Sequence, residues 1–293
     1  MSPTPSPAVT VAVQGELGSN SELAAHEFFG DRPLTIHPCA TFAGLFESVA
    51  GGDADFGMAP VENSLAGSIH EVWRLLPEHR LPVCGEILLR ISHCLISHPG
   101  SSLGDICDVY SHPQALAQCH DFLHSLDGAR QHEVYDTAGA VKMIKERGVR
   151  GEAAIASAQA AVDHGMEIVA GDLETRIENF TRFLVLHGGQ APLQGSGETK
   201  TTVVAQLGDR AGALPELLQP LRRRDLEVLK VESAKRLGEP WAYDIYLEFT
   251  GEATDGEGEA ALREMGEVAD QVVVVGSYPA GRRAVASLRR HAP

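Results

Sequence analysis

DVYSHPQALAQCHDFLHSL, from Asp108 to Leu126, predicts a short buried strand followed by a helix, and this pair decides the fold because it recurs twice. The repeats are HEVYD with TAGAVKMIKERG (132–148) and EAAIAS with AQAAVDHG (152–165). Strands that alternate with helices need crossover connections between parallel neighbours. This part of the chain therefore predicts an α/β fold with a mainly parallel sheet.

The N-terminal part of the chain shows the same alternation. A strand at Val9 to Val13 leads through the loop GELGSNS (15–21) into the helical segment ELAAHEFFG (22–30). The next segments predict a helix, a strand, a helix and a strand-rich run: TFAGLFESVAGG (41–52), ADFGMAPV (54–61), SIHEVWRLLPEH (68–79) and CGEILLRISHCLIS (84–97). In such folds ligands bind beyond the carboxyl ends of the strands, where a helix start presents free backbone N–H groups.

Four polar clusters fall at the predicted strand ends. They are Glu62–Asn63–Ser64, Ser111–His112–Pro113–Gln114, Asp136–Thr137 and Asn179 to Arg182. Each cluster alone is compatible with helix capping or solvation, but four of them in one α/β unit favour a shared binding site.

A change of composition separates the last third of the chain. HGGQAPLQGSGETK (187–200) is rich in Gly, Gln, Ser and Pro, which is typical of a flexible linker. Beyond it, TTVVAQL, GALPELLQPLRRR, LEVLKVES, WAYDIYLEF, EAALREMGEVA and QVVVVGSYP predict the order βαββαβ, a ferredoxin-like α+β sandwich. The expected boundaries are an α/β unit at 8–187, a linker at 188–198, the α+β domain at 199–279 and a tail at 280–293.

Composition excludes several classes of protein. The 293 residues carry a formal net charge of −16 with scattered basic residues, so a nucleic-acid-binding surface is not expected. Neither a membrane-spanning run nor a signal peptide is indicated. The five cysteines form no CxxC pair, which suits reduced thiols in a cytoplasm better than disulfides or a zinc site. The tail arginines, Arg282, Arg283, Arg289 and Arg290, are expected to be solvated.

In their order and spacing, these segments resemble the bacterial prephenate dehydratases that carry a C-terminal ACT regulatory domain. The matching pieces of the α/β unit are QGELGSNSELAA, FGMAPVENSLAGSIHEV, ISHCLI, YSHPQALAQC, DTAGAV, AAIASAQAA and NFTRFLVL. GALPELL, KVES and VVVVGSYP match the ACT part, so the resemblance covers about Val9 to Pro279. It implies a catalytic domain with two α/β lobes of the periplasmic-binding-protein type and a cleft, followed by the ACT domain.

The resemblance also implies the reaction. Prephenate would lose its ring carboxylate as carbon dioxide and its 4-hydroxyl as water, giving phenylpyruvate for phenylalanine synthesis, and no metal or redox cofactor is expected. Thr181 is expected to donate to the leaving hydroxyl, and Phe183 to pack in the core. Arg182 is expected to anchor a substrate carboxylate, with a salt bridge between lobes as its alternative role. The other expected substrate contacts are Glu62, Asn63, Ser64, Ser111, Gln118 and Thr137.

Several other residues near the expected site are given no catalytic role. A carboxylate beside an anionic substrate must be protonated, paired or structural, so Glu62 is expected to shape the site. His70, His93 and His112 lack an acidic or cysteine partner at an obvious spacing, so a catalytic histidine is not expected. Asn20 stands where the family often has an aromatic residue, a difference that bears on substrate fit.

The ACT domain of this family binds L-phenylalanine and feeds back on activity. The expected phenylalanine-binding residues are Gly212, Ala213, Leu214, Glu232 and Ser233. Ala234 and Lys235 depart from the Arg-Pro that completes the family's ESRP motif, which leaves the strength and sign of the regulation open. Because ACT sheets commonly pair between chains, a homodimer or homotetramer is expected.

Two alternative functions stay open. An arogenate dehydratase would act on the transaminated substrate, and the sequence does not separate a keto from an amino substituent. A non-catalytic sensor of aromatic acids would keep the cleft without the reaction, although the intact NFTRF motif argues against it.

Overall fold

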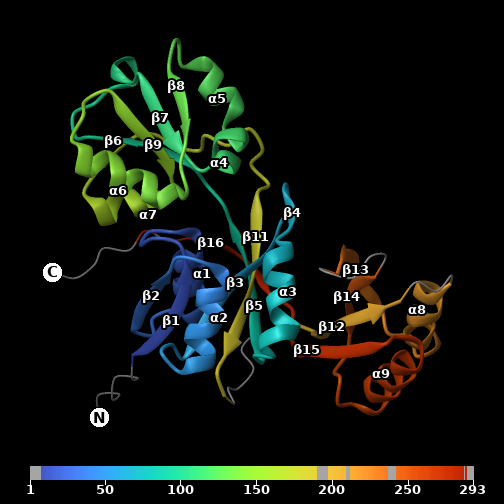
Figure 1. Cartoon of the computed structure of the whole chain (residues 1–293). Helices are drawn as coiled ribbons and strands as arrows, with labels where there is room; N and C mark the ends of the chain where they lie inside the picture. The colour runs from blue at the N-terminus through green and yellow to red at the C-terminus, as the bar shows by residue number, and fades with distance from the viewer. Residues whose placement is uncertain (1–7, 190–196, 209–211, 237–241, 287, 289–293) are drawn as a thin grey trace.

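The computed structural model describes residues 8–189, 197–208, 212–236, 242–286 and 288, which form three sheets with helices packed against them (Figure 1). Two sheets build the two lobes of an α/β unit, and the third belongs to a C-terminal unit, residues 199–279. Most of the expected linker at 188–198 lies outside the described residues. The described part of the chain contains no helix long and apolar enough to cross a membrane.

The first lobe contains a sheet with the strand order β16-β5-β11-β3-β1-β2, and β4 pairs with β3. Its strands are β1 (Val9–Gln14), β2 (Leu34–Cys39), β3 (Phe56–Asn63), β4 (Gly67–Ser68), β5 (Val83–Arg90), β11 (Phe180–His187) and β16 (Arg282–Val285). Its helices are α1 (Asn20–Phe29), α2 (Phe42–Gly51) and α3 (His70–His79). Val11, Met58 and Leu184 are fully buried between sheet and helices.

The second lobe contains a sheet with the strand order β10-β6-β9-β7-β8. Its strands are β6 (Cys94–Ser97), β7 (Asp108–Ser111), β8 (Arg130–Glu133), β9 (Glu152–Ala156) and β10 (Glu167–Ala170). Its helices are η1 (Leu103–Asp105), α4 (Pro113–Gln118), α5 (His120–Ser125), α6 (Thr137–Arg147) and α7 (Ala158–His164). The single helix predicted at 113–126 is two short helices, because Cys119 leaves the helical region with φ −102° and ψ 21°.

Both lobe sheets are mixed rather than mainly parallel. β1 is parallel to β2 and β3, and β7 is parallel to β8 and β9, as the crossover helices require. β11 is antiparallel to β3 and β5, and β6 is antiparallel to β9 and β10. The chain passes between the lobes twice, after β5 and before β11, and these paired strands lead from the first lobe toward the second (Figure 1). The prediction missed this double passage.

The C-terminal unit has the expected order βαββαβ. Its elements are β12 (Thr199–Leu207), α8 (Ala213–Arg223), β13 (Val228–Lys235), β14 (Tyr243–Thr250), α9 (Gly256–Val268) and β15 (Gln271–Pro279). The antiparallel sheet has the order β13-β14-β12-β15. α8 and α9 cover one face of it, and the other face packs on the first lobe.

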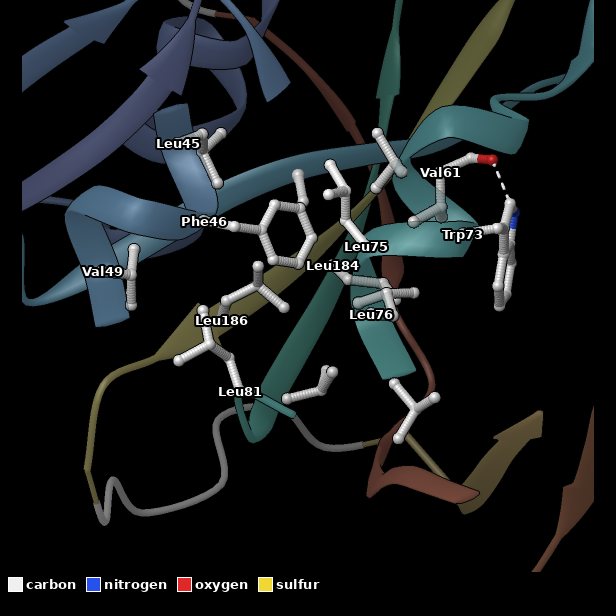
Figure 2. Close-up of a cluster of buried hydrophobic side chains, with 14 of the residues drawn as sticks. Leu45, Phe46, Val49, Val61, Trp73, Leu75, Leu76, Leu81, Leu184 and Leu186 are labelled. Carbon is white, nitrogen blue, oxygen red and sulfur yellow. Dashed lines mark hydrogen bonds between the residues drawn. The ribbon is translucent and has the colours of Figure 1, made fainter. Parts of the chain in front are cut away.

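One apolar cluster joins the first lobe to the C-terminal unit. Figure 2 shows its first-lobe part, in which Phe46 and Leu184 lie among other leucine and valine side chains. Trp73 of α3 donates from Nε1 to the carbonyl of Val61 at 2.9 Å (Figure 2). Its ring stacks on Tyr246 of β14 with a centroid distance of 5.0 Å. The two parts therefore share a buried core.

Part of the C-terminal tail forms a strand that was not predicted, although its Arg282 and Arg283 are exposed. β16 pairs in parallel with β5 and covers what is otherwise an open sheet edge. Arg282 donates from Nη2 to the carbonyl of Glu27 at 2.6 Å, and Arg283 lies 5.1 Å from the ring centroid of Phe180. Arg289 and Arg290 lie outside the described residues.

Candidate active site

A cavity of about 370 Å³ lies in the cleft between the two lobes. The described residues that line it are Asn20, Asn63, Ala66, Gly67, Ser68, Ile69, Ile91, His93, His112, Gln114, Ala115, Gln118, Thr137 and Thr181. They come from both lobes and from the segment between β5 and β6. None of these lining residues is a lysine or an arginine, so amides, hydroxyls and two imidazoles define the chemistry of the cleft.

Asn63, at the end of β3, has an amide whose orientation is fixed. Its Oδ1 accepts hydrogen bonds from the backbone N–H groups of Leu65 and Ala66, both at 3.0 Å. Because a backbone N–H can only donate, the amide nitrogen must face the other way. Nδ2 therefore donates to Asn179 Oδ1 at 2.8 Å and to Thr181 Oγ1 at 3.1 Å.

This orientation passes along a chain of buried side chains to His93. With Oδ1 of Asn179 accepting from Asn63, its Nδ2 donates to Oε1 of Gln118 at 2.9 Å. The same Gln118 oxygen lies 2.8 Å from Nε2 of His93, so that nitrogen must carry a proton. Burial lowers the pKa of His93, which favours the neutral ring. The amide chain thus sets the tautomer of this histidine.

Thr181 is left with its proton available. Its hydroxyl oxygen accepts from Asn63, and within the described residues it makes no further hydrogen bond. A hydroxyl that accepts one bond can still donate one. The amide chain therefore presents Thr181 as a donor toward the cavity that it lines.

Two helices from opposite lobes begin at this cavity. Asn20 is the first residue of α1 and Thr137 is the first residue of α6, and both line the cleft. The side chains of Ser19 and Asp136 cap these starts. A helix N-terminus carries a partial positive charge, so the cleft favours an anion although no lysine or arginine lines it.

Arg182, the expected carboxylate anchor, faces away from the cleft. Successive strand residues point to opposite sides of a sheet, so Thr181 faces the cavity and Arg182 faces the C-terminal unit. Its guanidinium lies 2.7 Å from Glu86 and 2.5 Å from Glu248, and 11% of the side chain is exposed. The anchor prediction is wrong in this structure. Its alternative, a salt bridge, is present, but it reaches the C-terminal unit rather than the second lobe.

The group around Arg182 is a buried ion cluster with balanced charge. Lys200 lies 2.6 Å from Glu86 and 3.5 Å from Glu248, so two cations face two carboxylates. Burial works against the charge of Arg182, but Tyr278, Glu248 and Glu86 hold its pKa well above the usual value. Burial likewise opposes the charge of Glu248, but Arg182 and Lys200 lower its pKa. Both shifts keep Arg182 and Glu248 charged at neutral pH. Phe183, the next residue of β11, packs in the core as predicted.

Two other expected substrate contacts, Ser111 and Ser64, have structural partners instead. Ser111 is fully buried and donates to the carbonyl of Ile155 at 2.6 Å, which ties β7 to β9. Ser64 donates to the carbonyl of Glu178 at 3.2 Å and accepts from the N–H of Phe180 at 2.9 Å. These predictions are wrong because each hydroxyl forms hydrogen bonds with the backbone, and neither residue lines the cavity.

Glu62 does not face the cleft either. It precedes Asn63 in β3 and faces the opposite side, where it lies 3.0 Å from Lys230 and 3.6 Å from Arg182. It is a paired carboxylate that does not contact the cavity. The expectation of a shaping role fits this position, and the expectation of substrate contact does not.

The residues expected to bind phenylalanine occupy two separate places. Gly212, Ala213 and Leu214 lie at the start of α8, whereas Glu232 and Ser233 lie in β13. No hydrogen bond or ion pair among the described residues joins the two groups. The carboxylate of Glu232 accepts a hydrogen bond from Ser68 and forms an ion pair with Lys230 at 2.9 Å, so it already has two partners within this chain.

The cleft also contains residues that were not assigned a role from the sequence. His93 and Ser68 line the cavity, and Asn179 is buried behind its lining. They belong to the segments ISHCLI, FGMAPVENSLAGSIHEV and NFTRFLVL, so the signal was present. His112 lines the cavity and accepts from the N–H of Gln114 at 3.2 Å. Polar residue type alone did not distinguish these side chains from caps.

Comparison with known proteins identifies relatives of the whole arrangement. A family model described as "PDT: Prephenate dehydratase" matches residues 11–191. A bifunctional chorismate mutase/prephenate dehydratase of Neisseria gonorrhoeae is 37% identical over 272 residues, covering 92% of this chain and 74% of the relative. Arogenate dehydratase/prephenate dehydratase 2 of Arabidopsis thaliana is 37% identical over 281 residues, covering 92% of this chain and 73% of the relative.

Two solved structures are similar to this chain over most of its length. A prephenate dehydratase of Arthrobacter aurescens in complex with L-Phe has a TM-score of 0.82 and 29% identity, covering 95% of this chain and 93% of the other. A structure titled "GqqA- a novel type of quorum quenching acylases" has a TM-score of 0.83 and 33% identity, covering 93% and 98%. These matches include both lobes and most of the C-terminal unit.

Proposed function

The chain belongs to the prephenate dehydratase family, a family of lyases, and we propose that it converts prephenate to phenylpyruvate in the cleft between the lobes. The observation that carries this proposal is Thr181, a hydroxyl donor that a chain of oriented amides presents to a cavity lined by no lysine or arginine. The substrate contacts that we retain are Asn63, Gln118 and Thr137, and Asn20 joins them because it lines the same cavity.

The reaction makes few demands on the protein. The bond between the ring and its carboxylate breaks, its electron pair enters the ring, and carbon dioxide leaves. The bond from the ring to the 4-hydroxyl breaks at the same time. The oxygen leaves as hydroxide with the electron pair of this carbon–oxygen bond, and it takes up one proton to become water. A donor placed at the leaving oxygen stabilises the negative charge that develops there. We assign this donor as Thr181.

The lack of a cation in the cavity lining suits this chemistry. A lysine or arginine against the ring carboxylate would stabilise the ground state more than the transition state, because the carboxylate loses its charge as carbon dioxide forms. Helix N-termini at Asn20 and Thr137 supply a weaker attraction.

Arg176 offers a cation at the edge of the site. A second cavity of about 470 Å³ is lined by Arg176 and shares Ala66, Gln114 and Gln118 with the cleft. The Arg176 side chain is exposed and forms no ion pair within the described residues. We propose that it contacts the side-chain carboxylate of the bound substrate, the role first expected of Arg182.

Replacing Arg176 with Ala is expected to raise KM for prephenate about tenfold or more, because a charge-assisted hydrogen bond contributes about 1.5–3 kcal/mol. The kcat value should change little, since this contact is the same in ground and transition states. Steady-state kinetics on R176A and R176K check this, with R150A, an exposed arginine of the second lobe, as control. An unchanged KM in R176A would remove Arg176 from the site.

We propose that residues 199–279 form an ACT domain that binds L-phenylalanine and regulates the cleft. The βαββαβ order and the bound L-Phe of the Arthrobacter aurescens relative support this. Because the two groups of expected effector residues are apart within one chain, we propose that a second copy completes the effector site. The exposed apolar residues Val228, Leu229 and Val231 on the edge strand β13 support pairing into a homodimer or homotetramer.

We propose a cytoplasmic location and the domain boundaries 8–187 and 199–279, with β16 as a return of the chain to the catalytic part. Four of the five free cysteines are buried and the fifth, Cys107, is exposed, a pattern that suits a reducing compartment.

Turnover of prephenate and of arogenate by the purified full chain, with and without L-phenylalanine, tests the proposed function. We expect phenylpyruvate from prephenate and a lower rate when phenylalanine is added. Exclusive use of arogenate would make the protein an arogenate dehydratase. Tight binding of both compounds without turnover of either would make it a sensor.

A further inference from the structure

Ser68 connects the cleft to the C-terminal unit. It lines the cavity and belongs to the short strand β4, in which Ser68 lies opposite Glu62 and Gly67 lies opposite Asn63. Its hydroxyl donates to Oε2 of Glu232 and accepts from Nζ of Lys230 at 3.1 Å. Both partners belong to β13, so the C-terminal unit holds a residue of the cleft directly.

Lys230 is the centre of this contact. Its Nζ lies 3.0 Å from Glu62 and 2.9 Å from Glu232, and 14% of the side chain is exposed. It also lies 5.7 Å from the ring centroid of Trp73, within range of a cation–π contact. An ammonium group with three donors is therefore fixed between β3, β4 and β13.

The hairpin of β3 and β4 carries this contact to the catalytic side chains. Its connecting residues include Leu65 and Ala66, whose N–H groups orient the amide of Asn63. One end of the hairpin is β3, and the other end is Ser68, which the C-terminal unit holds. Ser64 and Ile69 attach the same hairpin to the first-lobe backbone, and Ser68 adds its attachment to the C-terminal unit. We expect a displaced Ser68 to shift the loop whose N–H groups orient Asn63, and with it the Asn63 bond to Thr181.

We propose that Lys230 and Glu232 are positioning residues of the active site, which act through Ser68 and the β3–β4 hairpin to keep Asn63 and Thr181 in their productive arrangement. This inference rests on the proposed function and extends it to the C-terminal unit. It also gives an effector a short route to the cleft, because a ligand that engages Glu232 competes with its bond to Ser68.

Two measurements on the same variants test the proposal. The variants are Lys230→Met, Lys230→Arg and the control Lys235→Met, an exposed residue of the same strand. Hydrogen exchange of the peptide around residues 62–70 reports on the hairpin without any need for activity. We expect faster exchange in K230M than in the wild type, wild-type exchange in K235M, and partial recovery in K230R.

Kinetics on prephenate supply the second measurement. We expect kcat of K230M to fall about tenfold or more at saturating prephenate, because small misplacement of catalytic groups has large effects on rate. In a T181A background the same substitution should have little further effect, since both changes act on one donor.

The outcomes separate the inference from the proposed function. Unchanged exchange in K230M, or faster exchange with wild-type kcat, would overturn the inference while the function stands. A wild-type protein inactive on prephenate would refute the function and with it the catalytic part of the inference, and the exchange data would still decide whether Lys230 anchors the hairpin.

Discussion

Replacing Thr181 with Ala is expected to lower kcat for prephenate by about 10²–10³, the usual effect of removing one preorganised donor from a transition state. The hydroxyl is the donor of the cleft that the Asn63 amide orients, at 3.1 Å. KM should stay within a few-fold of the wild-type value, because the bond strengthens only as the hydroxide leaves. Steady-state kinetics on the purified variant measure both quantities.

Thr181→Ser is the matched variant, because it keeps the hydroxyl and loses the methyl group, and most of the activity should remain. Thr35→Ala, an exposed threonine of β2, controls for the substitution itself. If T181A retained near-normal kcat while folded, the assignment of Thr181 as the donor would be wrong.

Replacing Arg182 with Met is expected to cost about 3–5 kcal/mol in the free energy of unfolding, the usual penalty for breaking a buried ion pair from one side. Without its charge, Glu86 and Glu248 remain buried with only Lys200 to balance them. Because Arg182 faces the C-terminal unit, the KM of the folded variant should rise much less than that of R176A. Urea unfolding and kinetics at low temperature check the two parts separately.

The charge balance offers a sharp control for this prediction. In the double variant Arg182→Met and Glu248→Gln, Lys200 faces Glu86 alone, so part of the lost stability should return. Arg130→Ala, which breaks an exposed pair with Asp108, should change stability little. A stable R182M variant with a greatly raised KM would restore the original anchor role.

Much of the architecture followed from local pattern. Strand and helix periodicity predicted the alternation around Asp108 to Gly165 and the βαββαβ order after it, because these patterns depend on residues close in the chain. The antiparallel pairing of β11 and the returning strand β16 were missed. Their pairing depends on partners far away in the chain, such as β5, which no local pattern reports.

The site residues divided along the same line. Asn63, Gln118, Thr137 and Thr181 line the cleft together. The strand-end clusters suggested three of them, and the family resemblance suggested Gln118. The prediction for Arg182 was wrong because neighbouring residues in a strand face opposite sides of the sheet. Since Thr181 faces the cavity, Arg182 faces away from it. The prediction for Ser111 was wrong because its hydroxyl donates to the carbonyl of Ile155. The pairing of β7 with β9 brings this partner close, and the local sequence does not reveal it.

A crystal structure of the T181A variant with prephenate would test the central claim most directly. We predict that the substrate lies in the cleft between the lobes. Its 4-hydroxyl should lie beside residue 181, within hydrogen-bonding distance of the position that Oγ1 of Thr181 has in the wild type. No guanidinium should contact the ring carboxylate. Prephenate bound outside this cleft, or with a carboxylate paired to Arg182, would contradict the account.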